Sequence, residues 1–452
     1  MLCGKPAIRV RWRGLPAGVA IASRAERLRT FYAPTPEFPR CVAPDPRRKT
    51  GRVAHHATSQ SRARILICGG GFAAVEAALA LRALAGGRVA LSLLAPDPTF
   101  HYRPAATSEP FDIAPSRRYD LRAIARDVGA SYHESRLEAV ASGKHSVRTA
   151  SGARLHYDLL ILATGARAVV GVPGAMTFRD QRDVRLVRRL LDEVDTTAVR
   201  SIVFALPTGS TWPLPLYELA LLSSGHMRER GLAAGSTVVT PESEPLELFG
   251  TYASGVVRGL LEERGVRFVG GAVAAGVRRD GSLALVDGGP IRADRVLALP
   301  ELRGRRFTGV PARRSGFVPV DGSGRVEGVQ DVYAVGDMTT FPIKQGGLAA
   351  QQADVVAQTI AAGLGIRVKA VRAPRVLHAR LVGGEAPVFL RTEFDWSGLP
   401  TGAAIVRGDD ERNARADKVV GRYLVPYLRT QQPLRDAPQS SGRTSRSGEP
   451  PG

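Results

Sequence analysis

A glycine-rich turn beginning at residue 69 is the part of the sequence best suited to binding a phosphorylated cofactor. It separates an apolar stretch, residues 64–68, from an alanine-rich stretch, residues 75–84. Gly69 permits a tight turn, Gly71 lets the backbone approach a pyrophosphate, and Ala74 lets a helix pack closely on a strand. A helix N-terminus here would direct free N–H groups and a partial positive charge at the phosphates. The predicted cofactor-binding residues of this turn are Gly69, Gly70, Gly71, Phe72, Ala73 and Ala74.

An acidic residue normally ends the second strand of such a unit and binds the adenosine ribose. Here the second expected strand, residues 88–94, is followed by Ala-Pro-Asp. Asp97 in this loop is therefore either a ribose ligand or a turn residue. An ordinary glycine turn in an α/β unit is the corresponding alternative for residues 69–74.

Two more apolar strands stop at small residues that would let a dinucleotide pass close to the backbone. Residues 157–163 end in Ala163-Thr164-Gly165, and residues 332–335 end in Gly336-Asp337. The carboxylate of Asp337 could accept hydrogen bonds from the hydroxyls of a ribityl chain. The turn and the two strand ends together predict FAD. The alternatives are a buried strand meeting an ordinary turn and, at Asp337, a plain helix N-cap.

A further glycine-containing segment, residues 341–352, leads into a predicted helix. Gly346 and Gly347 would let the N-terminal amides of this helix face the pyrimidine end of the isoalloxazine ring. Together with Lys344, these amides would stabilise the anionic reduced flavin. A solvated surface lysine is the alternative for Lys344. The sequence identifies no general acid or base, and it predicts no metal site.

The elements that must position these residues alternate between strands and helices from residue 64 onward, as in doubly wound α/β domains. A second strand–turn–helix unit begins at residues 201–206, continues with a strand at 236–240 and closes with residues 296–299. Residues 332–335 then return to the first domain. The sequence therefore predicts an α/β fold of two Rossmann-like doubly wound domains, the second inserted in the first, with a small C-terminal domain.

The composition shifts along the chain define the expected boundaries. The ends are rich in Arg and Pro without a sustained apolar period, which is typical of disorder. The predicted parts are a disordered basic segment at 1–62, an FAD-binding domain at 63–170 and 306–375, an inserted NAD(P)-binding-like domain at 171–305, a C-terminal interface domain at 376–430 and a disordered tail at 431–452.

The length and charge of the chain limit the classes of function. A chain of 452 residues fits two or three domains. The net charge of +21 is uneven, because residues 1–64 hold 14 Lys/Arg against 3 Asp/Glu. We find no recognisable nucleic-acid-binding module, so the excess charge indicates a solvated basic segment, and no nucleic-acid partner is expected.

The cysteines and the hydropathy pattern indicate a reduced, cytoplasmic protein. The three cysteines are Cys3, Cys41 and Cys68, so a disulfide framework is excluded for the folded body. Cys68 ends an apolar strand and is most simply a small core residue. No run of 18 apolar residues occurs, so no membrane-spanning segment is predicted.

The combined motifs resemble the FAD-dependent pyridine nucleotide–disulfide oxidoreductase superfamily over about residues 64–430. The segments that carry this resemblance are residues 69–74, Ala163-Thr164-Gly165 and Gly336-Asp337. Residues 96–100, Tyr102-Arg103-Pro104 and residues 344–352 resemble the branch of sulfide:quinone oxidoreductase, flavocytochrome c sulfide dehydrogenase and type II NADH dehydrogenase. The resemblance implies an enzyme that passes electrons through bound FAD from a small-molecule donor to a quinone-like acceptor.

Two departures from the resembled enzymes narrow the expected activity. Sulfide oxidation uses cysteines close to the flavin, and this chain has no cysteine after Cys68. NADH oxidation uses a second pyrophosphate turn, but residues 204–218 lack two of its glycines in either register. Glu242 is either a ribose ligand or a solvated loop acid. Trp212 and Tyr217 line the flavin's substrate side or form an aromatic core.

Three functions are therefore compared: an FAD-dependent oxidoreductase without redox cysteines, an NAD(P)H-dependent flavin dehydrogenase, and a flavin-binding sensor or partner-binding protein without turnover. NAD(P) is a doubtful second cofactor. Residues 419–428 have an apolar, aromatic face. This face would close the domain, form a homodimer interface or make peripheral contact with a membrane surface.

Overall fold

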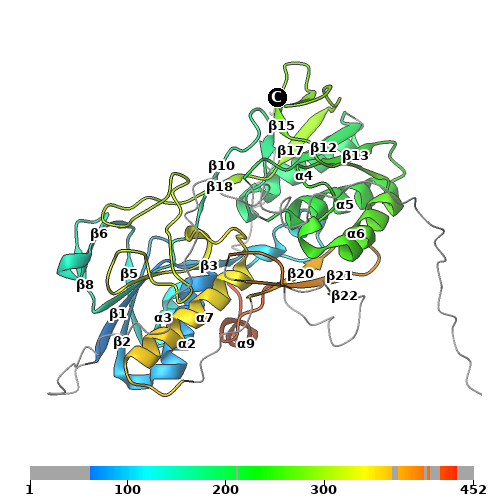
Figure 1. The fold of residues 1–452 in the computed structure, drawn as a ribbon. Helices are drawn as coiled ribbons and strands as arrows, with labels where there is room; N and C mark the ends of the chain where they lie inside the picture. The colour runs from blue at the N-terminus through cyan, green and yellow to red at the C-terminus, as the bar shows by residue number, and fades with distance from the viewer. Residues whose placement is uncertain are drawn as a thin grey trace, which may run out of the picture.

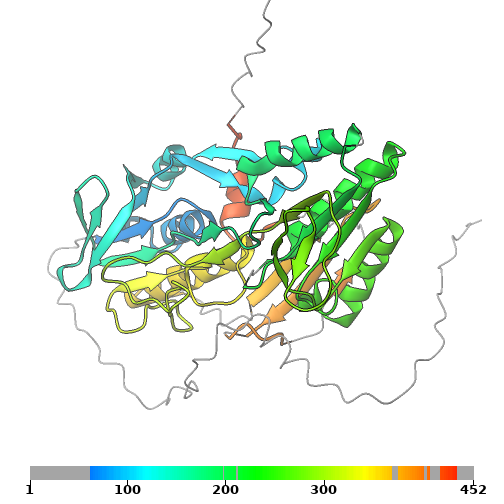
Figure 2. The same ribbon diagram turned by 90° about the horizontal axis from the view of Figure 1, so that it is seen from above.

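The computed structural model describes residues 62–434, except for 197, 210–211, 369–374, 396, 402–404 and 408–417. Cys3, Cys41 and nearly all of the two segments for which disorder is predicted lie outside the described residues. Figures 1 and 2 show two lobes, one coloured blue, cyan and yellow and the other green.

The first lobe is built on a five-stranded parallel sheet of order β19-β9-β1-β2-β5. Its strands are β1 (Ala63–Cys68), β2 (Val89–Ala95), β5 (Ala130–Glu134), β9 (Leu159–Leu162) and β19 (Val332–Ala334). Parallel strands are covered on both faces, which explains why β1 and β9 are almost continuously apolar. Because β19 pairs with β9, the chain returns to this sheet after a long excursion, as predicted.

Helices cover one face of this sheet, and a small antiparallel sheet covers the other. The helices are α2 (Phe72–Ala85), α3 (Leu121–Asp127) and α7 (Gly346–Gly363), and the strands opposite them are β6 (Leu137–Ala141), β7 (Ser146–Thr149) and β8 (Arg154–His156). Helices α2 and α7 lie side by side (Figure 1). Both are rich in alanine, so their backbones approach closely and their first turns lie near each other.

The second lobe is inserted between β10 (Arg167–Val169) and β18 (Glu301–Arg303), which pair with each other antiparallel. Its parallel sheet has the order β11-β17-β12-β13-β14. The strands are β11 (Met176–Thr177), β17 (Arg295–Ala298), β12 (Ser201–Ala205), β13 (Gly235–Val239) and β14 (Val266–Val269), and the helices are α4 (Val184–Asp195), α5 (Leu214–Glu229) and α6 (Thr251–Glu263). The edge strands β11 and β14 were not expected from the sequence.

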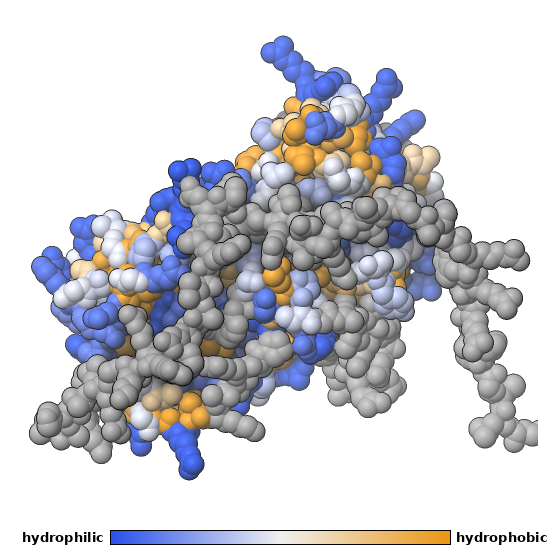
Figure 3. Space-filling view, viewed as in Figure 1, coloured by the Kyte–Doolittle hydropathy of each residue, from blue (hydrophilic) through white to orange (hydrophobic). Residues whose placement is uncertain are grey.

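Shorter elements complete the two lobes. They are β3 (Thr99–Tyr102), β4 (Arg117–Asp120), β15 (Ala274–Val277) and β16 (Leu283–Leu285). Figure 3 shows an apolar group of residues at the outer end of the inserted lobe, in the region of β15, beside mostly hydrophilic surface. The predicted fold, two Rossmann-like domains with one inserted in the other, is confirmed.

The C-terminal part consists of an antiparallel sheet and a short helix. The sheet contains β20 (Arg375–Leu381), β21 (Val388–Phe394) and β22 (Ile405–Arg407), and its buried face packs on the core of the inserted lobe near α5. Helix α9 (Leu424–Thr430) packs on α2 and buries Leu424 and Leu428. Leu424 and Leu428 thus help to close the first lobe. No helix among the described residues is long and apolar enough to cross a membrane.

Candidate functional site

Gly69 joins the glycine turn to the end of β9. Its φ of +141° lies in a region that L side chains rarely adopt, and a Cβ atom there would lie 2.2 Å from the carbonyl oxygen of Ala163. The N–H of Ala163 donates to the carbonyl of Cys68 at 2.7 Å, and the N–H of Gly69 donates to Leu94 at 2.8 Å. The close approach of these backbones therefore requires glycine at position 69.

Gly71 leaves open space in front of helix α2. It occupies the N-cap position with φ −98° and ψ −167°, and a Cβ atom there would meet nothing within 4 Å. No side chain caps the helix, and its first turn holds no acidic residue. The first amides of a helix and the positive end of its dipole suit an anion. Ala73 and Ala74 are buried, and Gly70 is confined between Leu121 and Ala95.

Gly336 brings the third predicted segment to the same place. Its φ is +74°, and a Cβ atom there would lie 3.1 Å from Cβ of Ala349 and 3.3 Å from Cβ of Ala73. The residue therefore sits between the first turns of α2 and α7. Its N–H donates to Oε1 of Gln352 on α7 at 2.7 Å, which fixes the strand end against that helix.

Asp337 follows in a short 3₁₀ turn, Gly336–Met338, whose N-cap residue is Val335. The N-cap of α7 is Gln345, so the alternative that Asp337 caps a helix does not agree with the structure. Burial raises the pKa of Asp337, while the positive charges of Lys344 and Arg103 act in the opposite direction. The carboxyl group therefore lies within electrostatic reach of two cations, near the point where three chain segments meet.

The end of β9 lies beside this turn. The hydroxyl of Thr164 is 3.5 Å from Sδ of Met338, and Gly165 has a φ of +66° with open space around its Cα. These contacts place Ala163, Thr164 and Gly165 next to residues 336–338. The structure thus brings together the three segments that the sequence associates with FAD, although the individual ligand assignments stay predictions.

Lys344 is buried, with 4% of its surface exposed, so the alternative of a solvated lysine is wrong. Its Nζ donates to the carbonyls of Thr339 and Phe341 at 2.5 and 2.6 Å, and it lies 3.9 Å from the centroid of the Phe317 ring. Burial lowers the pKa of Lys344 to about 7, against the attraction of Asp337. Its charge can therefore change near neutral pH.

Gly346 and Gly347 begin α7 and admit close neighbours. A Cβ atom on Gly346 would lie 3.3 Å from the ring of Phe72, and one on Gly347 would lie 3.2 Å from the backbone N of Val420. The side chain of Gln345 caps the helix by accepting from the N–H of Leu348 at 2.9 Å. The glycines thus allow the turn before α2 and the C-terminal part to pack at the start of α7.

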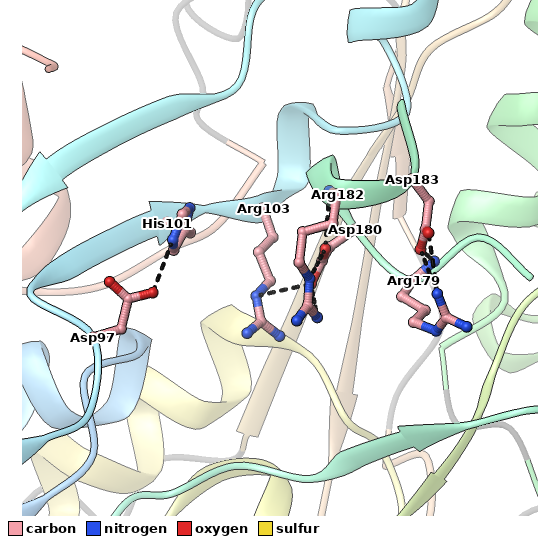
Figure 4. Close-up of polar contacts among 7 residues, drawn as sticks. All are labelled: Asp97, His101, Arg103, Arg179, Asp180, Arg182 and Asp183. Atoms are coloured by element: carbon pink, nitrogen blue, oxygen red, sulfur yellow. Dashed lines mark hydrogen bonds and ion pairs between the residues drawn. The ribbon is translucent and has the colours of Figure 1, made fainter. Parts of the chain in front are cut away.

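Asp97 lies in the loop after β2, and its side chain is 58% exposed. It accepts a hydrogen bond from the N–H of Thr99 at 2.9 Å, and Nε2 of His101 lies 3.4 Å away (Figure 4). These contacts are those of a turn residue. Because the carboxylate keeps free acceptor positions, its role as a ribose ligand stays a prediction.

Arg103 is a residue to which the sequence motifs gave no role of its own. Its side chain is 63% exposed and lies 3.9 Å from Asp180, whose buried carboxylate is already held by Arg182 at 2.7 and 2.8 Å (Figure 4). The guanidinium of Arg103 is therefore available to bind another anion. The positive charge of Arg103 also acts to lower the pKa of Asp337, so Arg103 lies within electrostatic reach of the turn at residues 336–338.

The arginines near Arg103 make this region positive. Burial and the charges of Arg167, Arg136 and Arg103 all lower the pKa of Arg305, so each of these three cations lies within electrostatic reach of Arg305. Such a cluster suits an anionic ligand such as a pyrophosphate. In the sequence, only the segment Tyr102-Arg103-Pro104 indicated this positive region.

The corresponding turn of the inserted domain is poorly suited to phosphate. Helix α5 begins at Leu214, but Pro213 and Pro215 carry no N–H, and the N–H of Leu216 donates to the carbonyl of Pro213 at 2.9 Å. Residues 213–216 therefore retain at most one free amide. A pyrophosphate-binding helix needs several.

Glu242 is not a solvated loop acid, which corrects that alternative, whereas its role as a ribose ligand stays a prediction. The side chain is fully buried, and its Oε2 accepts hydrogen bonds from Tyr217 at 2.7 Å and Thr240 at 3.1 Å. Burial raises the pKa of Glu242 to about 8. Tyr217 belongs to the core, and Trp212 packs against that core beside Phe249, as the core alternative predicted.

We expect Lys344→Met to lower the flavin midpoint potential by some tens of millivolts, because a buried cation favours electron uptake by a nearby cofactor. The difference from the wild-type protein should be larger at pH 6 than at pH 9, since the pKa of Lys344 is about 7 and the amine loses its charge as the pH rises. Spectroelectrochemical titration of both proteins at the two pH values measures it. Equal midpoint potentials of the two proteins at both pH values would show that Lys344 does not act on the flavin.

Comparisons with known proteins agree with this geometry. The chain is 27% identical over 310 residues to peroxisomal monodehydroascorbate reductase 2 of Oryza sativa subsp. japonica, covering 62% of each chain. It is 30% identical over 226 residues to the biphenyl dioxygenase system ferredoxin–NAD(+) reductase component of Paraburkholderia xenovorans, covering 47% of this chain and 51% of that protein. The chain thus spans between half and two thirds of these relatives.

Solved structures show the same fold. The sulfide:quinone oxidoreductase of Aquifex aeolicus matches with a TM-score of 0.68 at 19% identity, over 77% of this chain and 87% of that one. A covalent putidaredoxin reductase–putidaredoxin complex matches with a TM-score of 0.56 at 18% identity, over 74% and 82%.

The family model described as pyridine nucleotide-disulphide oxidoreductase matches residues 63–358. This range includes the glycine turn, the end of β9, Gly336 and the whole inserted domain. FAD is the cofactor that the sequence associates with these segments, and the roles of the α2 N-terminus and of Asp337 in binding it stay predictions. The chain belongs to the pyridine nucleotide-disulphide oxidoreductase family.

Proposed function

We propose that this enzyme passes electrons through bound FAD from an unidentified donor to a quinone-like acceptor, without redox cysteines. The observation that carries the proposal is the convergence of the glycine turn, the end of β9 and Gly336 between the first turns of α2 and α7. The similarity to sulfide:quinone oxidoreductase supports the acceptor class. When bound, the flavin supplies the redox chemistry, and the protein binds and orients it.

The residues of the site divide this work among them. The amides at the start of α2 and the guanidinium of Arg103 hold the pyrophosphate, since both present positive charge to open space. Asp337 would accept hydrogen bonds from the ribityl hydroxyls. Lys344 and the start of α7 would supply positive charge to the pyrimidine end of the ring.

The absence of redox cysteines distinguishes this proposal from sulfide chemistry. Cys68 is fully buried in β1, and burial raises the pKa of its thiol, which disfavours the reactive thiolate. The sequence has no cysteine beyond this position. The electrons are therefore proposed to reach the flavin without a thiol intermediate.

Anaerobic addition of a short-chain ubiquinone to the photoreduced protein tests the proposal. We expect the quinone to reoxidise the flavin, so that the absorption of oxidised flavin returns after mixing. Flavin that stays reduced with the quinone in large excess would instead favour a sensor or partner-binding protein without turnover.

An NAD(P)H-dependent dehydrogenase is the second candidate, because one relative is named as a ferredoxin–NAD(+) reductase component. The prolines of α5 and the inward position of Glu242 argue against it. We expect no rapid bleaching of the flavin on anaerobic mixing with NADH or NADPH. Photoreduction provides the control that the flavin can be reduced, and rapid bleaching by either nucleotide would establish the second candidate.

We propose a cytoplasmic setting for the protein. Peripheral membrane contact and a homodimer interface are the alternatives that experiment must test for the apolar face of residues 419–428. The apolar side chains Leu424 and Leu428 of α9 are used inside the molecule, which weakens a membrane role for this face. Flotation with phospholipid vesicles, compared between the intact protein and one truncated before α9, would test it. Equal flotation of both would remove the membrane role of α9.

A further inference from the structure

A buried ion pair joins the three parts of the molecule at one point. Glu218, on α5 of the inserted domain, is 2% exposed, and its carboxylate oxygens lie 2.7 Å and 2.9 Å from Nζ of Lys418. The hydroxyl of Thr107, in the FAD-binding domain, donates to the same carboxylate at 2.6 Å. The N–H of Val382, after β20, donates to it at 3.2 Å. One carboxylate therefore receives donors from the two other parts of the chain.

The environment makes the loss of one partner of this pair more costly than the loss of a partner in a surface ion pair. The side chain of Lys418 is only 12% exposed, and its Nζ also lies 3.4 Å from the hydroxyl of Thr107. A buried carboxylate that loses its cation keeps its desolvation cost, so breaking one partner of such a pair is far more disruptive than breaking an exposed pair. By contrast, the pair of Glu193 with Arg295 has both side chains about 40% exposed.

Lys418 lies where the C-terminal segment, defined here as residues 418–434, crosses the start of α7. A Cβ atom on Gly346 would lie 3.3 Å from Cγ2 of Val419, and one on Gly347 would lie 3.2 Å from the N of Val420. The two residues after Lys418 thus rest on the helix N-terminus that faces the proposed pyrimidine end of the flavin.

The same segment is attached at a second point. Glu76, fully buried on α2, accepts hydrogen bonds from the N–H groups of Tyr423 and Leu424 at 3.0 and 2.7 Å, which caps the start of α9. The stretch between Lys418 and Leu424 is therefore held at both ends by buried carboxylates from different domains.

We propose that Glu218 is a positioning residue that locks the C-terminal segment onto the N-terminus of α7, so that this segment forms one wall of the flavin chamber. The part concerning the wall rests on the proposed function, whereas the lock itself does not need the cofactor. The ion pair fixes the segment to the inserted domain, and Thr107 fixes both to the FAD-binding domain.

Hydrogen exchange of the backbone amides of residues 419–428, measured by mass spectrometry on the full-length protein freed of FAD, tests the lock. We expect at least tenfold faster exchange in Glu218→Gln and in Lys418→Met, because each variant breaks the pair. The double variant should exchange no faster than the single ones, since both remove the same interaction. The control Glu193→Gln breaks the exposed pair in the same domain and should exchange like the wild-type protein.

Unchanged exchange in Glu218→Gln would overturn the lock, and this isosteric variant carries the test if Lys418→Met does not fold. The wall is tested separately by iodide quenching of flavin fluorescence in the FAD-loaded protein. We expect severalfold stronger quenching in Glu218→Gln than in the wild type or in Glu193→Gln. Faster exchange without stronger quenching would refute the wall, whereas a protein that binds no FAD would refute the proposed function and leave the exchange result valid.

Discussion

The variant Gly71→Asp should fold normally and bind FAD at least 100-fold more weakly, which corresponds to about 2.8 kcal/mol. The backbone at position 71 has a conformation that any residue adopts, and a Cβ atom there meets nothing within 4 Å. The new carboxylate would occupy the space in front of α2. There it would compete for the helix amides and repel the pyrophosphate. FAD titration of the apoprotein, followed by flavin fluorescence, measures the change.

Gly87→Asp is the matched control for this prediction. Gly87 lies just beyond the other end of α2, and a Cβ atom there also meets nothing within 4 Å. The control adds the same charge close to the same helix, so it should bind FAD like the wild-type protein. Wild-type affinity in Gly71→Asp would place the phosphates elsewhere. Thermal unfolding of both apoproteins checks that neither substitution disturbs the fold.

Replacing Glu242 by glutamine should stabilise the protein at pH 9 by roughly 3 to 5 kcal/mol and change its stability little at pH 5. The pKa of this buried carboxyl is raised from 4.5 to about 8. The folded state therefore holds the proton across a range in which the unfolded state releases it. The stabilisation of the folded state that comes from this retained proton is fully present below about pH 4.5. It is lost as the pH rises through about 8. Above that pH a buried carboxylate destabilises the fold, and glutamine avoids this cost.

Urea unfolding of both apoproteins at pH 5 and pH 9 measures this difference. Glu262→Gln serves as the control, because Glu262 is exposed on α6 of the same domain and should not alter the pH profile. The inward position of Glu242 is contradicted if wild-type and Glu242→Gln proteins lose stability in parallel between the two pH values.

The sequence was sufficient to predict the parts of the site that depend on local backbone geometry. Gly69 and Gly336 combine a positive φ with close neighbours, which strongly favours glycine, so the residue type itself indicates the turn. The insertion was also predictable, since strands with the features of a second nucleotide-binding unit lie between β9 and β19. Because such signals are local, they can be read from the sequence without knowledge of tertiary contacts.

The parts that could not be predicted depend on contacts between distant residues. Lys344 is buried because Phe317 and two carbonyls enclose it, and a sequence pattern does not distinguish this from a solvated lysine. Glu242 turns inward because Tyr217 on α5 offers a donor in the core. The pair of Glu218 and Lys418 joins residues 200 positions apart.

The visible absorption spectrum of the purified protein, with FAD titration of any colourless preparation, tests the central claim most directly. A site formed by the turn before α2, the end of β9 and Gly336 should give the two visible bands of oxidised flavin. Denaturation should release about one FAD per chain. A well-folded protein that is colourless and takes up no added FAD would contradict the assignment of these three segments.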